Sequence, residues 1–181
     1  VSSVLNAIPA TAGSVGSTYI ASGAVGTTQL ASGAVTQSIL GTGVAGNGPT
    51  FSAWANASAA TIGTGATKVT FDTEDWDTNN NFASSRFTPT VAGYYQINAQ
   101  VQPAASYTGG YVWMYKNGST WASGNYINAA VSFGGFVVSS LVYCNGSTDY
   151  VEIYAAFTTS QATTSGVRGF TYMNGFLARS A

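Results

Sequence analysis

The chain has 181 residues, which is long enough for one domain with a hydrophobic core and an additional segment. Five Lys and Arg residues against six Asp and Glu residues give a net charge of −1, which excludes the basic surface that nucleic-acid binding needs. Histidine is absent, and no apolar run approaches the roughly 18 residues of a membrane-spanning helix, so we expect neither an enzyme nor a membrane span.

Residues 13–46 carry a ten-residue repeat that begins GSVGSTYIAS, GAVGTTQLAS and GAVTQSILGT. Each repeat has one valine and, five residues later, one isoleucine or leucine, which is too little apolar surface for a single chain to fold. Because five is odd, a turn or bulge between these two residues must bring both side chains to one side. We therefore expect an extended trimeric β-repeat stalk, with a flexible linker as the alternative. Its shared axis would consist of Val15, Ile20, Val25, Leu30, Val35 and Leu40.

Residues 1–12 precede the first repeat and are interpreted as an anchor or linker segment that attaches the stalk to another protein. The chain begins with Val1 rather than methionine and opens without a signal peptide. We therefore expect a processed product or a piece of a longer chain.

The composition changes at Asn47-Gly48-Pro49, a strong loop signal, and residues 47–181 are interpreted as a separate domain of short strands without a helix. Apolar and polar residues alternate over residues 94–101, and Asn117-Gly118 is typical of a hairpin turn. The pattern predicts an antiparallel sandwich, specifically a jelly roll. The expected strands are 69–71, 94–101, 111–116, 136–144, 150–157 and 167–177, with a polar loop at 158–165.

Aromatic side chains are frequent in this domain, and we expect most of them in the core or between subunits. Cys144, the single cysteine, lies in an apolar run and is expected to be a small buried core residue. The aromatic residues assigned to packing are Trp54, Trp76, Trp113, Phe133, Phe136, Phe170 and Phe176.

An acidic window offers the hard oxygen ligands that calcium prefers: Asp72, Glu74, Asp75 and Asp77, followed by three asparagines. The window lacks the glycine and the distal glutamate of an EF-hand loop. The sequence therefore predicts either a calcium site or a solvated acidic loop, and it predicts no other cofactor.

Aromatic residues in loop-like surroundings are the candidates for receptor binding: Tyr107, Trp121, Asn125 and Tyr126, next to glycines and serines. Aromatic faces together with Asn, Ser and Thr hydrogen-bonding groups suit a carbohydrate, which has apolar C–H faces and hydroxyl edges. The alternative for each aromatic residue is packing in the core or between subunits.

Six fragments of residues 49–181 resemble, in the same order, the signature of the C1q/tumour necrosis factor superfamily. The main fragment has spaced aromatics at Phe82 and Phe87, followed by Gly93-Tyr94-Tyr95-Gln-Ile97. The Gly-Asp pair of the family is Thr148-Asp149 in this chain. The resemblance implies a ten-stranded jelly roll that forms a compact homotrimer, in which some family members hold calcium. The other fragments begin at Phe51, Lys68, Asn117, Asp149 and Asn174.

The decapeptide segment resembles shaft segments of bacteriophage fibre proteins, which often end in a trimeric knob. We therefore expect a fibre protein on the virion surface, of the tail or the head, whose knob binds the bacterial host surface through a glycan or a protein. Residues 1–12 would bind another virion protein. One alternative is a purely structural capsid decoration without a receptor. Another is a secreted C1q-like lectin or cytokine-like protein, which would need a signal peptide before Val1.

Overall fold

The structure, a computed structural model, describes residues 20–26, 28, 30–35, 39 and 48–181. The chain divides into two units, Val1–Ala45 and Gly46–Ala181, and each is described here by itself. The expected anchor segment 1–12 and the axis residues Val15 and Leu40 lie outside the described residues.

The described part of the repeat segment contains the same turn twice, ten residues apart. The backbone N–H of Ala24 donates to the carbonyl of Ala21 (3.0 Å), and that of Ala34 donates to Ala31 (2.9 Å). The third residue of each turn is a glycine with φ of +76° or +79°, and no other residue of the turn has a positive φ, which is the pattern of a type II turn. Glycine takes this conformation without the steric cost that a Cβ atom would add.

The turn follows Ile20 and precedes Val25, so it comes in addition to the turn or bulge expected between each valine and the next isoleucine or leucine. Thr28, which lies in that other half of the repeat, is also in a turn. The described residues between 20 and 39 contain no strand, so the expected β-structure is not found in them.

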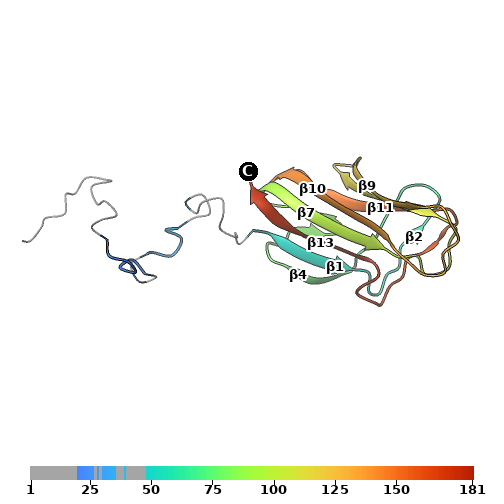
Figure 1. Cartoon of the computed structure of the whole chain (residues 1–181), viewed down its shortest axis with the longest axis horizontal. Helices are drawn as coiled ribbons and strands as arrows, with labels where there is room; N and C mark the ends of the chain where they lie inside the picture. The colour runs from blue at the N-terminus through green and yellow to red at the C-terminus, as the bar shows by residue number, and fades with distance from the viewer. Residues whose placement is uncertain (1–19, 27, 29, 36–38, 40–47) are drawn as a thin grey trace, which may run out of the picture. The chain divides into compact units, whose positions relative to one another are not determined.

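The second unit consists of antiparallel strands in two facing, open sheets, with no helix among the described residues (Figure 1). One sheet has the order β10-β7-β13-β1-β4, and the other has the order β5-β6-β11-β8-β9, with β3 also paired to β11. A small third sheet pairs β12 with β2. The strands are β1 Thr50–Trp54, β2 Thr61–Ile62, β3 Thr67–Lys68, β4 Thr73–Asp77, β5 Phe82–Ala83, β6 Arg86–Phe87, β7 Ala92–Val101, β8 Gly110–Lys116, β9 Ser119–Ile127, β10 Phe136–Asn145, β11 Val151–Phe157, β12 Gln161–Ala162 and β13 Tyr172–Ser180.

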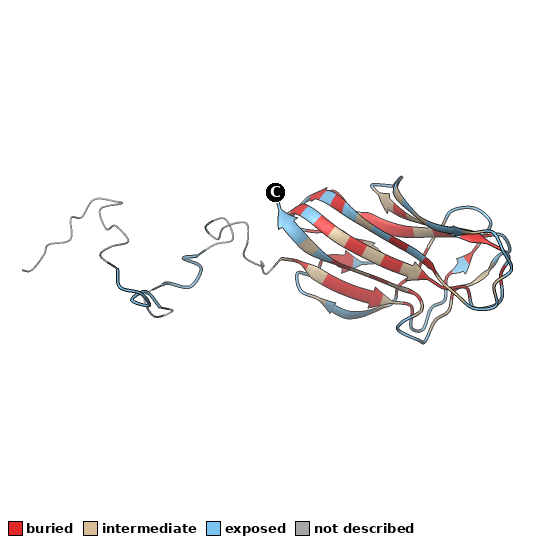
Figure 2. Ribbon diagram, in the orientation of Figure 1, coloured by how far each residue is buried: buried red, intermediate tan, exposed pale blue. Residues whose placement is uncertain are grey.

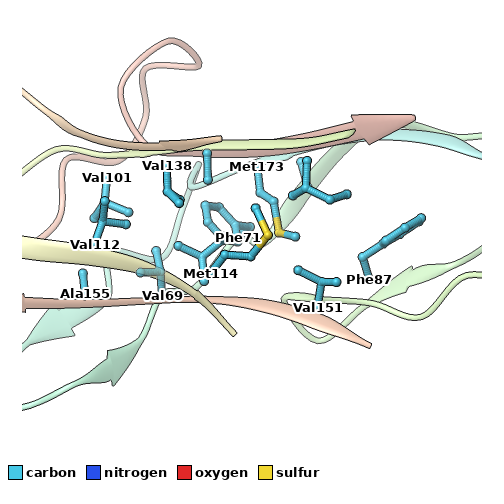
Figure 3. Packing of buried hydrophobic residues seen from close by; sticks show 14 of the residues in the cluster. Val69, Phe71, Phe87, Val101, Val112, Met114, Val138, Val151, Ala155 and Met173 are labelled. Atoms are coloured by element: carbon cyan, nitrogen blue, oxygen red, sulfur yellow. The ribbon is translucent and has the colours of Figure 1, made fainter. Parts of the chain in front are cut away.

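The core lies between the two sheets, and strand alternation determines which side chains reach it. Figure 2 shows the alternation of buried and less buried residues along the strands of the five-stranded sheet. Val138 and Met173 of this sheet meet Met114 and Ala155 of the other sheet in the close view of Figure 3. The expected inward face of the central strand β7 is confirmed by four side chains with no exposed surface: Tyr95, Ile97, Ala99 and Val101.

The predicted hairpin turn at Asn117-Gly118 is also confirmed. Both residues have positive φ, +52° and +76°, and they join β8 to β9 through the pair Lys116 and Ser119. Positive φ at both central positions defines a type I′ turn, whose twist matches that of the two strands.

Two predicted strands and one predicted loop differ from the structure. Residues 69–71 follow the short strand β3 instead of forming one, because the backbone N–H of Phe71 binds the Ser85 hydroxyl (2.8 Å). Residues 167–171 form a turn, so the last strand begins at Tyr172 and continues to Ser180. The expected polar loop at 158–165 contains the two-residue strand β12. With these short pieces, the described residues contain 13 strands, where ten were expected.

Three of the aromatic residues assigned to packing are exposed in the single chain: Trp76 (47%), Phe133 (70%) and Phe176 (50%). Trp76 lies on β4 and Phe176 lies on β13 of the five-stranded sheet, and both side chains point away from the core. Phe136 is buried as predicted, and so is Cys144.

Candidate functional site

The outer face of the five-stranded sheet carries an unusual concentration of uncharged polar side chains. On β7, the residues between the core positions point outward, among them Gln96 and Asn98. The Gln96 amide donates to Asn98 Oδ1 (3.2 Å) and to Ser139 Oγ (2.9 Å), and Ser139 Oγ donates to the same Asn98 oxygen (2.7 Å). Asn98 Nδ2 then donates to Asn174 Oδ1 (3.2 Å). This network extends over three neighbouring strands and holds its amides in fixed orientations.

Large exposed apolar side chains lie on the same face near the C-terminus, and we call them the association patch. Two rings of the patch, Tyr94 and Tyr143, together with Leu141 line an open hollow of about 670 Å³ whose other wall is residues 178–181. The association patch consists of Tyr94, Val137, Leu141, Tyr143 and Phe176, each between 38% and 50% exposed. Exposed apolar side chains grouped on one face in this way are typical of a protein–protein contact.

At the opposite edge of this sheet, strands β1, β4 and β13 form a second hollow of about 340 Å³, which we call the tryptophan pocket. Ser52 and Trp54 alternate outward from β1, and a bulge in the β1–β4 pairing leaves Asp75 as the extra residue between Glu74 and Trp76. The residues that line the pocket include Ser52, Trp54, Asp75, Trp76, Arg168 and Tyr172.

Asp75 is the centre of polar contacts in the tryptophan pocket. Its Oδ2 atom accepts hydrogen bonds from Ser52 Oγ (2.9 Å) and from Arg168 Nε (2.7 Å), and Arg168 Nη2 lies 2.6 Å away. The guanidinium carbon of Arg168 also lies 5.8 Å from the centre of the Trp76 ring. The Trp54 indole N–H is buried and has no hydrogen-bond acceptor within the described part of the chain.

The predicted calcium ligands do not gather in the described structure. Asp72 accepts backbone N–H bonds from residues 56–58 (2.6–2.9 Å), and these bonds outweigh burial and lower the pKa of its carboxyl. Asp75 is paired with Arg168, and Asp77 accepts the backbone N–H of Phe82 (2.6 Å). Burial and the charge of Asp77 raise the pKa of Glu74. Residues 20–181, as far as described, contain no group of three or more His, Cys, Asp or Glu that could hold a metal ion.

The four predicted receptor-binding residues differ in how far their side chains are exposed. Tyr107 is only 4% exposed, and its hydroxyl donates to the carbonyl of Gly134 (3.2 Å), so the prediction that it faces a ligand is wrong for the single chain. Trp121, Asn125 and Tyr126 lie together on strand β9, not in a loop as expected. Trp121 and Tyr126 are 47% and 51% exposed, while Asn125 Oδ1 accepts the backbone N–H of Val137.

The buried acid on the other sheet is held in an ion-pair cluster. Glu152 Oε1 accepts from Lys68 Nζ (2.7 Å) and Arg86 Nε (2.8 Å). Burial opposes ionisation of this carboxyl, but the two cations outweigh burial and lower its pKa. Paired twice in this way, Glu152 lacks the raised pKa typical of a general acid.

Sequence reasoning missed the tryptophan pocket because it assigned Trp54 and Trp76 to packing. The alternation of β1 carried a signal for Trp54, since Phe51 and Ala53 face inward and Trp54 must therefore face outward. The partnership of Asp75 with Arg168 had no such signal, because the two residues are 93 positions apart.

Solved structures of similar fold include domains from zebrafish, mouse and S. frugiperda. The globular domain of zebrafish complement 1qA matches with a TM-score of 0.57 and 17% identity, over 74% of this chain and 99% of that one. An Eiger TNF from S. frugiperda matches with a TM-score of 0.55 and 8% identity, over 75% and 96% of the two chains. Murine APRIL matches with a TM-score of 0.54 and 10% identity, over 71% and 98%.

No family model and no curated protein matches the chain. None of the described residues belongs to a helix long and apolar enough to cross a membrane. The likenesses to solved structures concern the fold, and they agree with the two facing sheets and the absence of helices described above. The C-terminal unit of this chain is therefore an all-β sandwich whose fold is similar to that of C1q and TNF jelly-roll domains.

Proposed function

We propose that this chain is a non-enzymatic, homotrimeric fibre protein of a bacteriophage virion, whose C1q-like knob binds a glycan on the bacterial surface. The observation that carries the proposal is the regular repeat segment with exposed apolar side chains, joined in one chain to a C1q/TNF-type sandwich. Residues 1–12 attach the fibre to another virion protein in this proposal.

The repeat segment supports association because its described apolar side chains keep about half of their surface exposed in one chain. Ile20, Val25, Leu30 and Val35 are between 42% and 51% exposed, although they recur in register with the two glycine turns. Ordering each residue costs roughly 1–2 kcal/mol, whereas a fully buried Val, Leu or Ile contributes only about 1.5–3 kcal/mol. Two further copies of the chain would bury these side chains and provide the missing contacts.

The knob supports the same stoichiometry through its association patch. The patch lies on the outer face of the five-stranded sheet, and pairing it with a different surface of a neighbour would be a heterologous contact, which forms a closed ring when the rotation between neighbours permits closure. A trimeric knob would also hold three repeat segments at high effective concentration and so favour their association.

The proposed ligand class follows from the surface chemistry of the knob. The whole chain has only 11 charged residues, and its outer faces carry amides, hydroxyls and exposed aromatic rings. Such surfaces suit the hydroxyl edges and C–H faces of sugars better than charged polymers.

The test combines native mass with binding to bacteria. We expect sedimentation of the full chain to give three times the chain mass, and the labelled trimer to bind cells of a susceptible host and purified envelope glycan from them. A monomer would contradict the trimer and leave the repeats as a linker. A trimer that coats virion capsids but binds neither cells nor glycan would contradict the receptor role and favour a structural capsid fibre.

A further inference from the structure

We propose that the tryptophan pocket is a binding site for one neutral pyranose unit of a glycan. This inference rests on the proposed function and deepens it, because it assigns the sugar-binding site to residues that the sequence placed in packing or in a calcium loop. It moves the site from β9, where Trp121 and Tyr126 lie, to the opposite sheet.

The aromatic part of the pocket can hold the apolar face of a sugar ring. Trp76 is 47% exposed on the edge strand β4, and Tyr172 of β13 lies directly across from Trp54 of β1. The hollow between them, about 340 Å³, is within the range of roughly 300–1,000 Å³ that is typical of small-molecule sites. Indole rings combine a large apolar face with one polar N–H group, as a pyranose ring requires.

Two polar atoms of the pocket have unused hydrogen-bonding capacity. The three donors around Asp75 all converge on Oδ2, so Oδ1 remains available as an acceptor with no partner in the described part of the chain. The Trp54 N–H is a buried donor without an acceptor, which costs about 1–3 kcal/mol in a folded protein. A sugar hydroxyl would donate to Asp75 Oδ1, whereas the Trp54 N–H, which has no accessible surface, becomes available to a ligand only when the indole ring turns.

The charges of the pocket indicate a neutral ligand. The Asp75 carboxylate and the Arg168 guanidinium neutralise each other at 2.6 Å, and no other charged side chain lines the hollow. An anionic sugar would have to compete with Asp75 for Arg168, and a cationic one would have to compete with Arg168 for Asp75. A neutral pyranose needs neither exchange and leaves the ion pair intact, with Arg168 still against Trp76.

The second possible occupant is a neighbouring copy of this chain. The pocket lies at the β4 edge of the sheet, whereas Val137, Leu141 and Tyr143 of the association patch lie on β10 at the other edge. Phe176 of the patch lies on β13, which also contributes Tyr172 to the pocket, so the two surfaces adjoin on one face of the sheet. The pocket differs from the apolar patch in its Asp75–Arg168 ion pair and its free Asp75 oxygen, so we assign it to a ligand rather than to a subunit contact.

The experiment uses the full chain with ¹⁵N-labelled tryptophan and observes the four indole N–H signals by NMR. The probes are the methyl pyranosides of glucose, galactose, mannose, rhamnose and N-acetylglucosamine, with methyl glucuronide as the charged comparison. We expect at least one neutral pyranoside to shift the Trp54 and Trp76 signals and to leave Trp113 and Trp121 in place, and we expect the glucuronide to bind more weakly.

Trp121 provides a matched control, because it is 47% exposed like Trp76 and lies on a different sheet. We expect Trp76→Ala and Asp75→Asn each to weaken binding of the active pyranoside by at least about tenfold, and Trp121→Ala to leave it unchanged. Sedimentation should show the same native mass for all three variants.

Three outcomes would overturn the assignment. The first is the absence of any shift at Trp54 and Trp76 with all five neutral sugars. The second is loss of binding in Trp121→Ala but not in Trp76→Ala. The third is a change of native mass in Trp76→Ala, which would make the pocket a subunit contact. Binding of the wild-type trimer to host cells, measured in parallel, tests the proposed function separately, because it can persist when the pocket fails and can fail when the pocket binds sugar.

Discussion

Tyr94 of β7 and Tyr143 of β10 lie directly across from each other on the outer face of the five-stranded sheet, with their ring centres 5.4 Å apart. Both rings are partly exposed, and neither contributes to the core between the sheets. Their contact fixes the position of the two rings in the association patch, since an aromatic pair of this kind contributes about 0.5–1.5 kcal/mol of stabilising energy beyond that of its buried area.

The first prediction concerns this pair. Tyr143→Glu should separate the knobs, because a carboxylate buried in the subunit contact loses its hydration, and Lys116, 5.6 Å from the Tyr143 ring, is already paired with Asp149. We expect the native mass to fall from three chains to one, measured by light scattering, with an unchanged circular dichroism spectrum. Tyr126→Glu, at an exposed ring of the other sheet, is the control and should keep the trimer. A Tyr143→Glu protein of unchanged mass would show that another surface holds the subunits.

The second prediction concerns the repeat segment. Leu30→Asp should open the repeats, since it places a charge on the proposed axis, and hydrogen exchange at Ala24 and Ala34 should become faster. The knob should remain trimeric. Ser32→Asp adds the same charge within a turn, away from the axis, and should leave exchange slow. Equal exchange rates in wild-type protein and Leu30→Asp would favour the flexible linker.

The third prediction concerns the turn glycine Gly23. A Cβ atom at this position meets nothing within 4 Å, so the effect of Gly23→Ala should come from the φ of +76° alone. We expect a cost of about 1–2 kcal/mol in the stability of the repeat segment, measured by hydrogen exchange. Gly23→Asn should cost less, because asparagine tolerates the left-handed region better than alanine. Equal costs for the two variants would contradict the type II turn.

The fourth prediction concerns pH and the Glu152 ion pairs. The pKa of Glu152 is lower in the folded than in the unfolded protein, so its stabilising effect is complete above the unfolded pKa of 4.5. The effect is lost as the pH falls through the folded pKa. Urea unfolding from pH 7 to pH 3 should therefore show a loss of stability that is smaller in Glu152→Gln.

At pH 7, the same variant should lose roughly 2 kcal/mol, less than the 3–5 kcal/mol of fully buried pairs, since Lys68 and Arg86 are partly exposed. Asp75→Asn breaks a more exposed ion pair and serves as the comparison, with a smaller expected loss. If Glu152→Gln retains the full acid dependence, another carboxyl is responsible for it.

The fifth prediction concerns Cys144. Burial raises the pKa of its thiol to about 11, and the residue has no exposed surface. Because the thiolate is the reactive form, the folded protein should react with a thiol reagent at pH 8 only as fast as the knob opens. Addition of urea above the unfolding midpoint should give rapid modification of one thiol per chain. Rapid modification without urea would mean that β10 is accessible in the native state.

Local patterns in the sequence predicted the central strand of the fold well. The alternation from Tyr94 to Val101 identified the inward residues, since one periodic face buried against a second sheet leaves a clear signal. The dipeptide Asn117-Gly118 fixed a hairpin for a similar reason, because few residues accept two successive positive φ values.

The candidate site was less predictable because it depends on contacts between distant segments. Trp76 faces solvent through a bulge that no single-strand pattern reveals, and its cationic neighbour Arg168 comes from a turn near the end of the chain. The Ser-Gly-Asn segment before Tyr126 has loop composition, yet pairing with β8 and a hydrogen bond to Val137 make it strand. Tyr107 was misplaced because an isolated bridge to Val131 draws it inward.

Because the turns at Gly23 and Gly33 are alike, the length of the repeat segment can change in steps of one ten-residue repeat. Insertion or deletion of exactly ten residues would preserve the phase of every following valine and leucine, whereas a shift by one or two residues would bring small or polar residues into most of their places. A gene that duplicates or loses one decapeptide could thus lengthen or shorten the distance spanned by the segment while the knob chemistry stays constant. Variation among natural relatives should accordingly concentrate in the number of repeats rather than in their internal spacing.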